Sequence, residues 1–485
     1  MLSAEKEALR DAEYELAPRR GSRLSQILSA HEIFQEQENI EHPIVEIMNK
    51  ANIQVKDYFE NREGKEIADA INIEYLKEFS LLNNPLSSKF GIAPNDLGRI
   101  LEKLELLGFS LKNESNLGLG SNNLLFIAAE LLLLKKDSGY LGLKLSLIEE
   151  IEAHLHPQSQ LNLIDFLNKQ SVSLGFQTII STHSNSLASK ADLNNMLLCK
   201  GGEVYSLRKG ETRLADTDYE FLRRFLDNTK ANLFFAHAVI IVEGDAENLL
   251  IPTFAEYIGY PLHKYGISIV NVGNTALLRY AKIFQRTDGT GIGIKVSCVT
   301  DRDIPPKEAS EYTYEIKRRK TGLIEQVSLL TDSRKTEEDY TAAQIKDIID
   351  KKKAKFEGAD VKVYLPKVWT LEFEIAKSCL RKDLHKAIQL ALKTDDLEIE
   401  ITRAILAEVG KKVEEDFDKW SGEGKTASQI AVEIYAPLER KLASKAVAAQ
   451  IFARLLSKSK IAVQDILDDE NLKYLVDAIK YVANV

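Results

Sequence analysis

Four acidic residues in the middle of the sequence have the types and the spacing to bind divalent metal ions. Glu243 follows the apolar run 239–242, and Glu247 lies four residues further on. Asp301 and Asp303 follow a second strand-like run at 295–300. Carboxylate oxygens suit Mg²⁺ or Mn²⁺, and two such ions can hold the attacking and leaving oxygens of a phosphodiester. The pattern therefore predicts a two-metal site for phosphodiester chemistry.

The elements that would position these acids alternate between strand and helix. We expect strands at 239–242, 267–270 and 295–300, with helices at 248–258 and 275–285 between them. This order predicts a parallel α/β sheet that carries ligands at the carboxyl ends of its strands. Gly244 permits a tight turn after the first strand. The two-residue period of a strand predicts that Asp301 and Asp303 point the same way.

A strand-end Glu-Gly followed two strands later by Asp-x-Asp resembles the Toprim fold. In the sequence these motifs are Val242-Glu243-Gly244 and Asp301-Arg302-Asp303. The resemblance implies that Glu243 and Asp301 are catalytic. It also implies a metal site that includes Glu247 and Asp303.

A second group of polar residues follows two apolar runs nearer the N-terminus. Glu149 and Glu150 end the run 145–148, and His183 follows the run 178–180. This order resembles the C-terminal half of an ABC-type ATPase domain. The resemblance implies that Glu149 holds the Walker B position, Glu150 the catalytic carboxylate and His183 the switch histidine.

The same resemblance places a signature loop at residues 118–121, with Gly118 and Gly120 as its glycines. Gly118 stands where that loop usually has serine. A phosphate-binding loop, Gly-x-x-x-x-Gly-Lys-Ser/Thr, is missing, because Gly424-Lys425-Thr426 has Lys419 at its first glycine position. We therefore expect the chain to begin inside an ATPase domain and to lack its N-terminal lobe. ATP would be a cofactor only if that lobe is supplied, and ATPase activity of this chain alone is not expected.

The two patterns in this order resemble the OLD (overcoming lysogenization defect) family of ATPase–nucleases, which includes the nuclease subunit of the Gabija anti-phage system. The resemblance covers residues 115 to 460. It implies metal-dependent cutting of DNA, a dimer or higher homo-oligomer, and a role in bacterial defence or DNA processing. It adds Glu372 to the metal ligands, with Glu374 a weaker candidate. It also implies a catalytic lysine, for which Lys445 fits best and Lys425 is next.

These features predict an α/β fold: a partial ABC-type ATPase lobe with a helical arm, then a Toprim α/β domain and C-terminal helices. The expected divisions are a helical arm or dimerisation region at 1–110, the C-terminal part of the ATPase domain at 111–236, the Toprim domain at 237–380 with an insertion at about 304–361, and a helical region at 381–485.

Composition limits the partners. The net charge of −9 argues against coating nucleic acid over the whole surface, although a local basic run such as 317–320 or 351–353 can still contact DNA. Three cysteines without paired spacing fit a reducing cytoplasm. The longest apolar run, 124–134, is too short to span a membrane. We expect DNA as substrate, a helicase or ATPase as a possible partner, and no membrane association.

Two other classes of function remain open. Topoisomerases and primases also use Toprim acids, but none of the 17 tyrosines stands out as a nucleophile, and three scattered cysteines cannot form a zinc module. The alternative outside the nucleases is an ABC-class, ATP-gated DNA-binding or repair protein, in which the acids serve only the fold. Cleavage that depends on a divalent metal would separate these classes.

Overall fold

The computed structural model describes residues 12–35, 41–81, 83–91, 96–107, 118–136, 145–174, 177–273, 276–317, 324–331, 333–394 and 401–485. By their internal contacts, the residues fall into two compact units, Met1–Leu187 and Ala188–Val485, called unit 1 and unit 2 below. None of the described helices combines the length and the apolar character that crossing a bilayer requires.

The first part of unit 1 is helical, as the sequence predicts. Its helices are α1 (Ala12–Leu16), α2 (Arg23–Ala30), η1 (Glu32–Phe34), α3 (Pro43–Asn61), α4 (Lys65–Asp69), η2 (Ala70–Leu76), α5 (Lys77–Phe79) and α6 (Leu97–Leu101). Leu16 and Leu24 pack with Phe126 of a later helix in a small core. Helix α3 has no buried residue, and it leaves Ile47 and Ile53 exposed.

The second part of unit 1 forms an α/β layer. It contains α7 (Leu119–Lys136), β1 (Leu145–Glu149), α8 (Pro157–Leu174) and β2 (Gln177–Ser181). The two strands are parallel, and Glu149 pairs with Ser181. Apolar side chains of α7 and α8, such as Ile127 and Leu167, pack with Ile151. The predicted strands and helices of this region are therefore present.

Unit 2 is built on a four-stranded parallel sheet in the order β10-β7-β5-β6. The strands are β5 (Ala238–Val242), β6 (Ile267–Asn271), β7 (Lys295–Val299) and β10 (Val361–Tyr364). Helix α11 (Asp245–Tyr257) connects β5 to β6, and α12 (Leu277–Lys282) lies between β6 and β7. The alternation predicted from the sequence is present, with β10 added at one edge.

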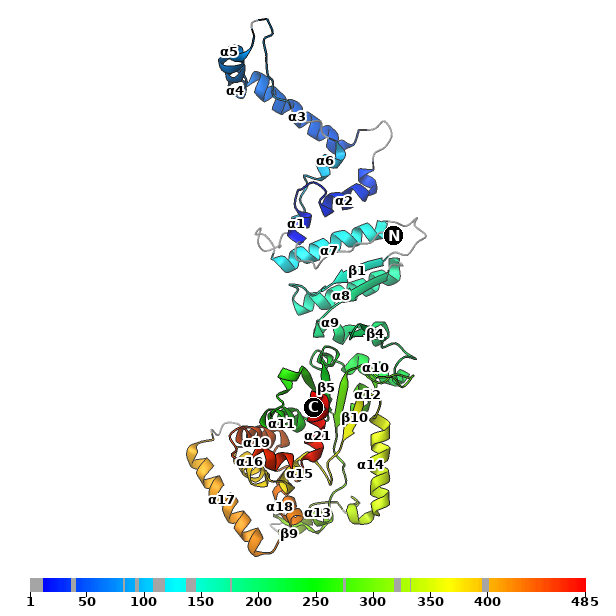
Figure 1. Cartoon of the computed structure of the whole chain (residues 1–485), viewed down its shortest axis with the longest axis vertical. Helices are drawn as coiled ribbons and strands as arrows, with labels where there is room; N and C mark the ends of the chain where they lie inside the picture. The colour runs from blue at the N-terminus through cyan, green and yellow to red at the C-terminus, as the bar shows by residue number, and fades with distance from the viewer. Residues whose placement is uncertain are drawn as a thin grey trace. The chain divides into compact units, whose positions relative to one another are not determined.

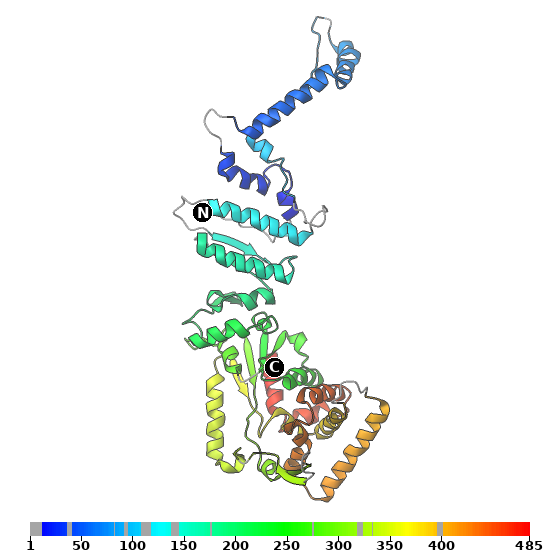
Figure 2. The ribbon, with the colours of Figure 1, turned by 180° about the vertical axis from the view of Figure 1, so that it is seen from behind.

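Alternate residues of β5 face two separate cores. Ile240 and Val242 belong to a core shared with α11 and the C-terminal helices. Val239 and Ile241 belong to a core shared with α12. Since side chains of a strand alternate between faces, the sheet is buried on both sides, as in other parallel sheets. Figures 1 and 2 show α11 and α21 on one side of the sheet and α12 and α14 on the other.

The expected insertion and C-terminal helices are also present. The insertion contains α13 (Lys307–Glu311), the antiparallel hairpin of β8 (Thr313–Lys317) and β9 (Ile324–Ser328), η6 (Glu337–Asp339) and α14 (Ala342–Phe356). After β10 follow α15 (Leu371–Lys377), α16 (Arg381–Lys393), α17 (Arg403–Gly422), α18 (Ala427–Glu439), α19 (Lys445–Leu456), α20 (Val463–Leu467) and α21 (Lys473–Ala483).

The boundary between the units differs from the predicted domain boundary at 236/237. It falls inside α9 (Asn185–Lys190), so residues 188–236 belong to unit 2. This segment contains η3 (Leu193–Asn195), β3 (Leu197–Lys200), β4 (Glu203–Ser206), α10 (Asp216–Phe225) and η4 (Lys230–Phe234). Outside it, η5 (Leu262–Tyr265) lies between α11 and β6. Its buried Leu198 and Leu222 pack in the same core as Ile241.

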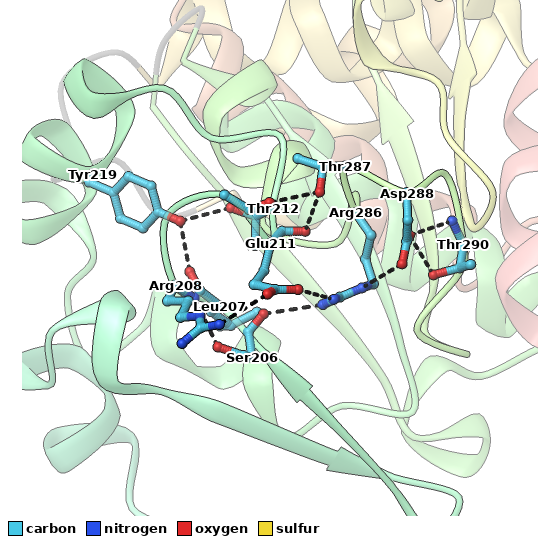
Figure 3. Close-up of polar contacts among 11 residues, drawn as sticks. Ser206, Leu207, Arg208, Glu211, Thr212, Tyr219, Arg286, Thr287, Asp288 and Thr290 are labelled. Atoms are coloured by element: carbon cyan, nitrogen blue, oxygen red, sulfur yellow. Dashed lines mark hydrogen bonds and ion pairs between the residues drawn. The ribbon is translucent and has the colours of Figure 1, made fainter.

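Polar contacts also fix this segment to unit 2 (Figure 3). Arg286 donates to Glu211 Oε2 at 2.6 Å and to the carbonyl of Ser206 at 3.2 Å. The hydroxyl of Tyr219 donates to the carbonyl of Leu207 at 2.7 Å, and Thr287 donates to the carbonyl of Gly210 at 2.8 Å. The buried apolar side chains and these hydrogen bonds together explain why residues 188–236 belong to unit 2.

Candidate active site

The register of the central strands brings the first acids together. Strands β5 and β7 are neighbours, and Val242 pairs with Val299. The residues that follow each strand, Glu243 and then Thr300 with Asp301, therefore leave the sheet side by side. Ligand sites of parallel sheets lie at this edge, and the sequence pattern predicted these positions.

Glu243 is held by the neighbouring strand. The Thr300 hydroxyl donates a hydrogen bond to Glu243 Oε1. Burial raises the pKa of Glu243, and the charge of Asp303 adds to this increase. The hydrogen bond from Thr300 and the positive charge of Lys352 act in the opposite direction. Glu243 is thus a partly buried carboxylate with one neutral donor and one nearby cation.

Glu247 lies in the first turn of α11, and its carboxylate folds back over the start of that helix. A methyl group on Gly244 would lie 2.9 Å from Glu247 Oε2, so glycine leaves room for this carboxylate. Burial, followed by the charge of Glu372, raises the pKa of Glu247 to about 7. Lys445 lowers that pKa, and Glu243 raises it slightly. Three site residues, Glu372, Lys445 and Glu243, are therefore close enough to Glu247 to influence its charge.

Asp301 is partly buried at the start of the loop that follows β7. The backbone N–H of Leu371 donates to its Oδ1 at 3.1 Å. Burial raises its pKa well above the usual range, and the charges of Glu372 and Glu247 raise it further. Lys445 again opposes the shift. The same lysine and the same glutamates thus surround both Glu247 and Asp301.

Asp303 does not point in the same direction as Asp301, contrary to the prediction from strand alternation. Strand β7 ends at Val299, before either aspartate. Asp303 has a φ of +65°, in the left-handed region, which aspartate adopts more readily than most residues. Its side chain is 67% exposed and lies 3.3 Å from Lys352 Nζ. The two-residue period fails because the chain has already turned out of the strand.

Two further predicted site residues, Glu372 and Lys445, lie in helices that follow β10. Glu372 lies in the first turn of α15, which is capped by the Thr370 hydroxyl accepting from Phe373 N. Its side chain is 5% exposed, and Oε2 lies 3.3 Å from Lys445 Nζ, at the first residue of α19. Burial alone would lower the pKa of Lys445, but Glu372, Tyr435 and Asp301 hold it above its usual value. The structure thus brings Lys445 and Glu372 to the predicted acids.

The two weaker candidates have other partners. Glu374 is fully buried, and its Oε1 accepts from the backbone N–H of Val368 at 2.6 Å. Lys425 pairs with Glu433 and, at 3.2 Å, with Glu423. Glu374 therefore supports the loop before α15, and Lys425 is engaged within the C-terminal helices.

Three residues of the site were not identified from the sequence. Lys352 lies in the basic run 351–353 but contacts the aspartate loop. Thr300 is the hydroxyl donor to Glu243. The buried Tyr474 hydroxyl has no hydrogen-bond partner among the described residues, and its pKa is raised well above the usual value, by burial first and then by the charges of Asp301 and other site acids. Only Thr300, at a strand end beside Asp301, had a sequence signal.

The site matches a divalent metal in donor chemistry. Its carboxylates are hard oxygen donors, and they raise each other's pKa because two lysines do not balance their charge. In the described part of the chain, no group of three or more His, Cys, Asp or Glu side chains could hold a metal ion as it stands. The side chains would have to turn toward one another, so the metal site stays a proposal.

The acids and histidine of the ATPase-type pattern meet in unit 1. Glu149 ends β1 beside Ser181, and the N–H of Glu150 donates to the Ser181 carbonyl at 3.0 Å. Glu150 has a φ of +45°. Glu152, which the sequence analysis did not single out, accepts from His183 N at 2.6 Å. Glu149, Glu150 and the His183 loop therefore lie at one edge of the β1–β2 pair.

The predicted signature loop begins α7. A methyl group on Gly120 would lie 2.2 Å from the carbonyl oxygen of His154, whereas one on Gly118 would meet nothing within 4 Å. Nearby, Asn123 donates to the carbonyl of Ala153 at 2.9 Å. Glycine at position 120 is thus required by the close approach of the 153–155 turn.

Two family models match this chain, one in the Toprim region and one in the ATPase region. The family model described as "Overcoming lysogenization defect protein-like, TOPRIM domain" matches residues 234–303. An AAA ATPase domain model matches residues 5–188, which includes the region expected to be a helical arm. The fold and the two sites define an ATPase–Toprim protein. Over residues 234–303 the chain is similar to the Toprim domain of the OLD family.

Curated relatives are similar over part of their length. Endonuclease GajA of Bacillus cereus (strain HuB5-5) is 26% identical over 39% of this chain and 31% of its own length. The Escherichia coli Retron Ec83 probable ATPase is 38% identical over 14% of this chain and 12% of its own length. The chain thus spans about a third or less of these relatives.

One solved structure is the C-terminal region of the Xanthomonas campestris pv. campestris OLD protein, at 20% identity. The alignment covers 52% of this chain and 95% of that one, with a TM-score of 0.29. This score is too low to support an argument about the fold.

Proposed function

We propose that the chain is a metal-dependent DNA endonuclease whose Toprim centre cleaves phosphodiester bonds. The observation that carries the proposal is the convergence of buried carboxylates on one lysine. Glu247, Asp301 and Glu372 come from three separate segments, yet each lies within the electrostatic influence of Lys445. A protein that used these residues only to fold would gain little from crowding like charges together.

Glu243, Glu247, Asp301, Asp303 and Glu372 would hold Mg²⁺ or Mn²⁺. When bound, such ions supply an activated water and stabilise charge on the phosphodiester. Lys445 would donate to a phosphoryl oxygen as negative charge develops there. Thr300 and the N–H of Leu371 orient Glu243 and Asp301. These hydrogen bonds restrict the directions in which the two carboxylates can turn when they close on a metal.

The other parts of the proposal concern the context of the cleavage. Unit 1 would regulate it through ATP, provided that a phosphate-binding lobe is supplied. The exposed Ile47 and Ile53 of α3 offer apolar surface for a homodimer. We also propose DNA as the substrate, a helicase or ATPase as a possible partner, a cytoplasmic location, and a role in anti-phage defence.

A plasmid-nicking assay tests the central proposal. The chain should nick supercoiled DNA with Mn²⁺ or Mg²⁺ without added ATP, and EDTA should stop the reaction. Asp301→Asn removes one charge but retains the shape of the side chain. It should reduce the rate of nicking by several orders of magnitude. Glu374→Gln is a control, because Glu374 binds a backbone N–H of the supporting loop.

Full cleavage by Asp301→Asn would refute the assignment of the centre. Metal-independent DNA binding without any cleavage by the parent would favour the alternative, an ABC-class DNA-binding or repair protein.

A further inference from the structure

Helix α14 of the insertion brings a cation to the aspartate loop. Lys352 Nζ donates to the backbone carbonyl of Asp301 at 2.5 Å and lies 3.3 Å from Asp303 Oδ2. Its positive charge also lowers the pKa of Glu243. The ammonium group therefore interacts with three of the residues proposed to bind metal.

The anchoring of α14 makes this contact a property of the fold. Thr341 and Gln344 form a capping box at its start. Phe356 at its end is buried in the core behind the sheet, and Gln285 donates to the Phe356 carbonyl. The capping box defines where the helix starts, and the contacts of Phe356 hold its C-terminal end against the core, one turn after Lys352.

The neighbouring lysine provides a contrast. Lys351 has a side chain that is 72% exposed and pairs with Asp347 at 2.7 Å, one turn away on the same helix. The Lys352 side chain is 24% exposed. Lys352 therefore contacts the aspartate loop, whereas Lys351 forms a solvent-exposed ion pair within its own helix.

We propose that Lys352 is a resident cation of the Toprim site, which a divalent metal must displace from Asp301 and Asp303 in order to bind. This inference rests on the proposed metal site. The Lys352 ammonium and a divalent ion both require the carboxylate of Asp303, and the ammonium also binds the backbone carbonyl of Asp301, next to the second proposed ligand. At a separation of a few ångströms the two cations would also repel each other.

Displacement is feasible because Lys352 remains partly open to water. The lysine stem has four carbons and rotates freely, so the ammonium can move into solvent while α14 stays in place. Lys352 would thereby set the metal concentration at which the site becomes occupied. In the metal-free protein it balances part of the acidic charge, and in the presence of metal it competes.

The test is direct binding of Mn²⁺ to the full chain by calorimetry, without DNA. Lys352→Met keeps the apolar stem and removes the charge. It should bind Mn²⁺ about tenfold more tightly, since losing one competing hydrogen-bonded charge is worth about 1.4 kcal/mol. Lys351→Met is the matched control, and it should bind like the parent.

Lys352→Arg retains the charge and should also bind Mn²⁺ within about twofold of the parent, by the same competition. If Lys352→Met does not fold, Lys352→Gln replaces it with the same expectation. Equal or weaker Mn²⁺ binding by the neutral variants would mean that Lys352 organises the aspartates, and the inference would be wrong. A parent chain that binds no Mn²⁺ would overturn the metal site as well, so the two failures are distinguishable.

Discussion

Replacement of Lys445 separates a catalytic role from a structural one. Lys445 Nζ lies 3.3 Å from Glu372 Oε2, and the Lys445 side chain is 41% exposed. Two unit charges at that distance attract by about 5 kcal/mol at an effective dielectric of about 20. Solvent screening at the lysine reduces this attraction, but Glu372 is 5% exposed and would be left unpaired, so the net loss of stability is about 1–3 kcal/mol. Lys445→Ala should therefore leave the protein folded, given typical stabilities of about 5–15 kcal/mol.

The expected loss of activity is larger than this loss of stability can explain. Removing one preorganised donor to the transition state typically costs about 10²–10³ in rate. The Lys445→Ala variant should therefore nick DNA about 10²–10³ times more slowly at saturating metal. Its affinity for Mn²⁺ should not fall, because an ammonium group is not a metal ligand and loss of the cation beside Glu372 favours metal binding.

The assay is single-turnover nicking of supercoiled plasmid at saturating Mn²⁺, accompanied by a melting curve for each variant. Lys441→Ala is the control, because Lys441 is exposed in the turn before α19. Unchanged nicking by Lys445→Ala would show that the lysine only neutralises Glu372, and the catalytic assignment would be wrong.

Two further predictions concern pH and ATP. The folded-state pKa of Glu247, about 7, lies above its ordinary value of 4.5, so the folded chain binds this proton more tightly than the unfolded chain. The stabilising effect is complete below about pH 4.5 and is lost as the pH rises through 7. In EDTA, the melting temperature of the parent should fall relative to that of Glu247→Gln between pH 5 and pH 8, and a constant difference would contradict the assignment. Titration of a fluorescent ATP analogue should detect weak binding to this chain alone, and tight Mg²⁺-dependent binding would reveal a phosphate-binding loop that the sequence analysis missed.

The positions of the first acids could be predicted because they depend on local patterns. An apolar run followed by Glu-Gly identifies the end of β5, and a second run identifies β7. Parallel pairing then places Glu243 and Asp301 together without further information. The direction of Asp303 could not be predicted, since it depends on where β7 ends and on a backbone angle of the following loop.

Residues brought in by tertiary packing were harder to identify. Glu372 and Lys445 came from family resemblance, because helices far apart in the sequence deliver them. Lys352 belongs to a charged run that has the composition of a solvated helix face, and only the packing of α14 distinguishes it from Lys351. The inclusion of residues 188–236 in unit 2 likewise depends on buried contacts between distant segments.

The two ends of the insertion are joined at the base of the site. Strand β10 pairs with β7, and the N–H groups of Arg302 and Asp303 donate to the carbonyl of Trp369 at 3.1 and 3.3 Å. The β8–β9 hairpin between these joined ends can therefore change in length while Asp301 and Glu372 keep their relative positions. The entropy of closing a loop grows only slowly with its length. The insertion can therefore carry changes in its hairpin without transmitting them to the acids at its base.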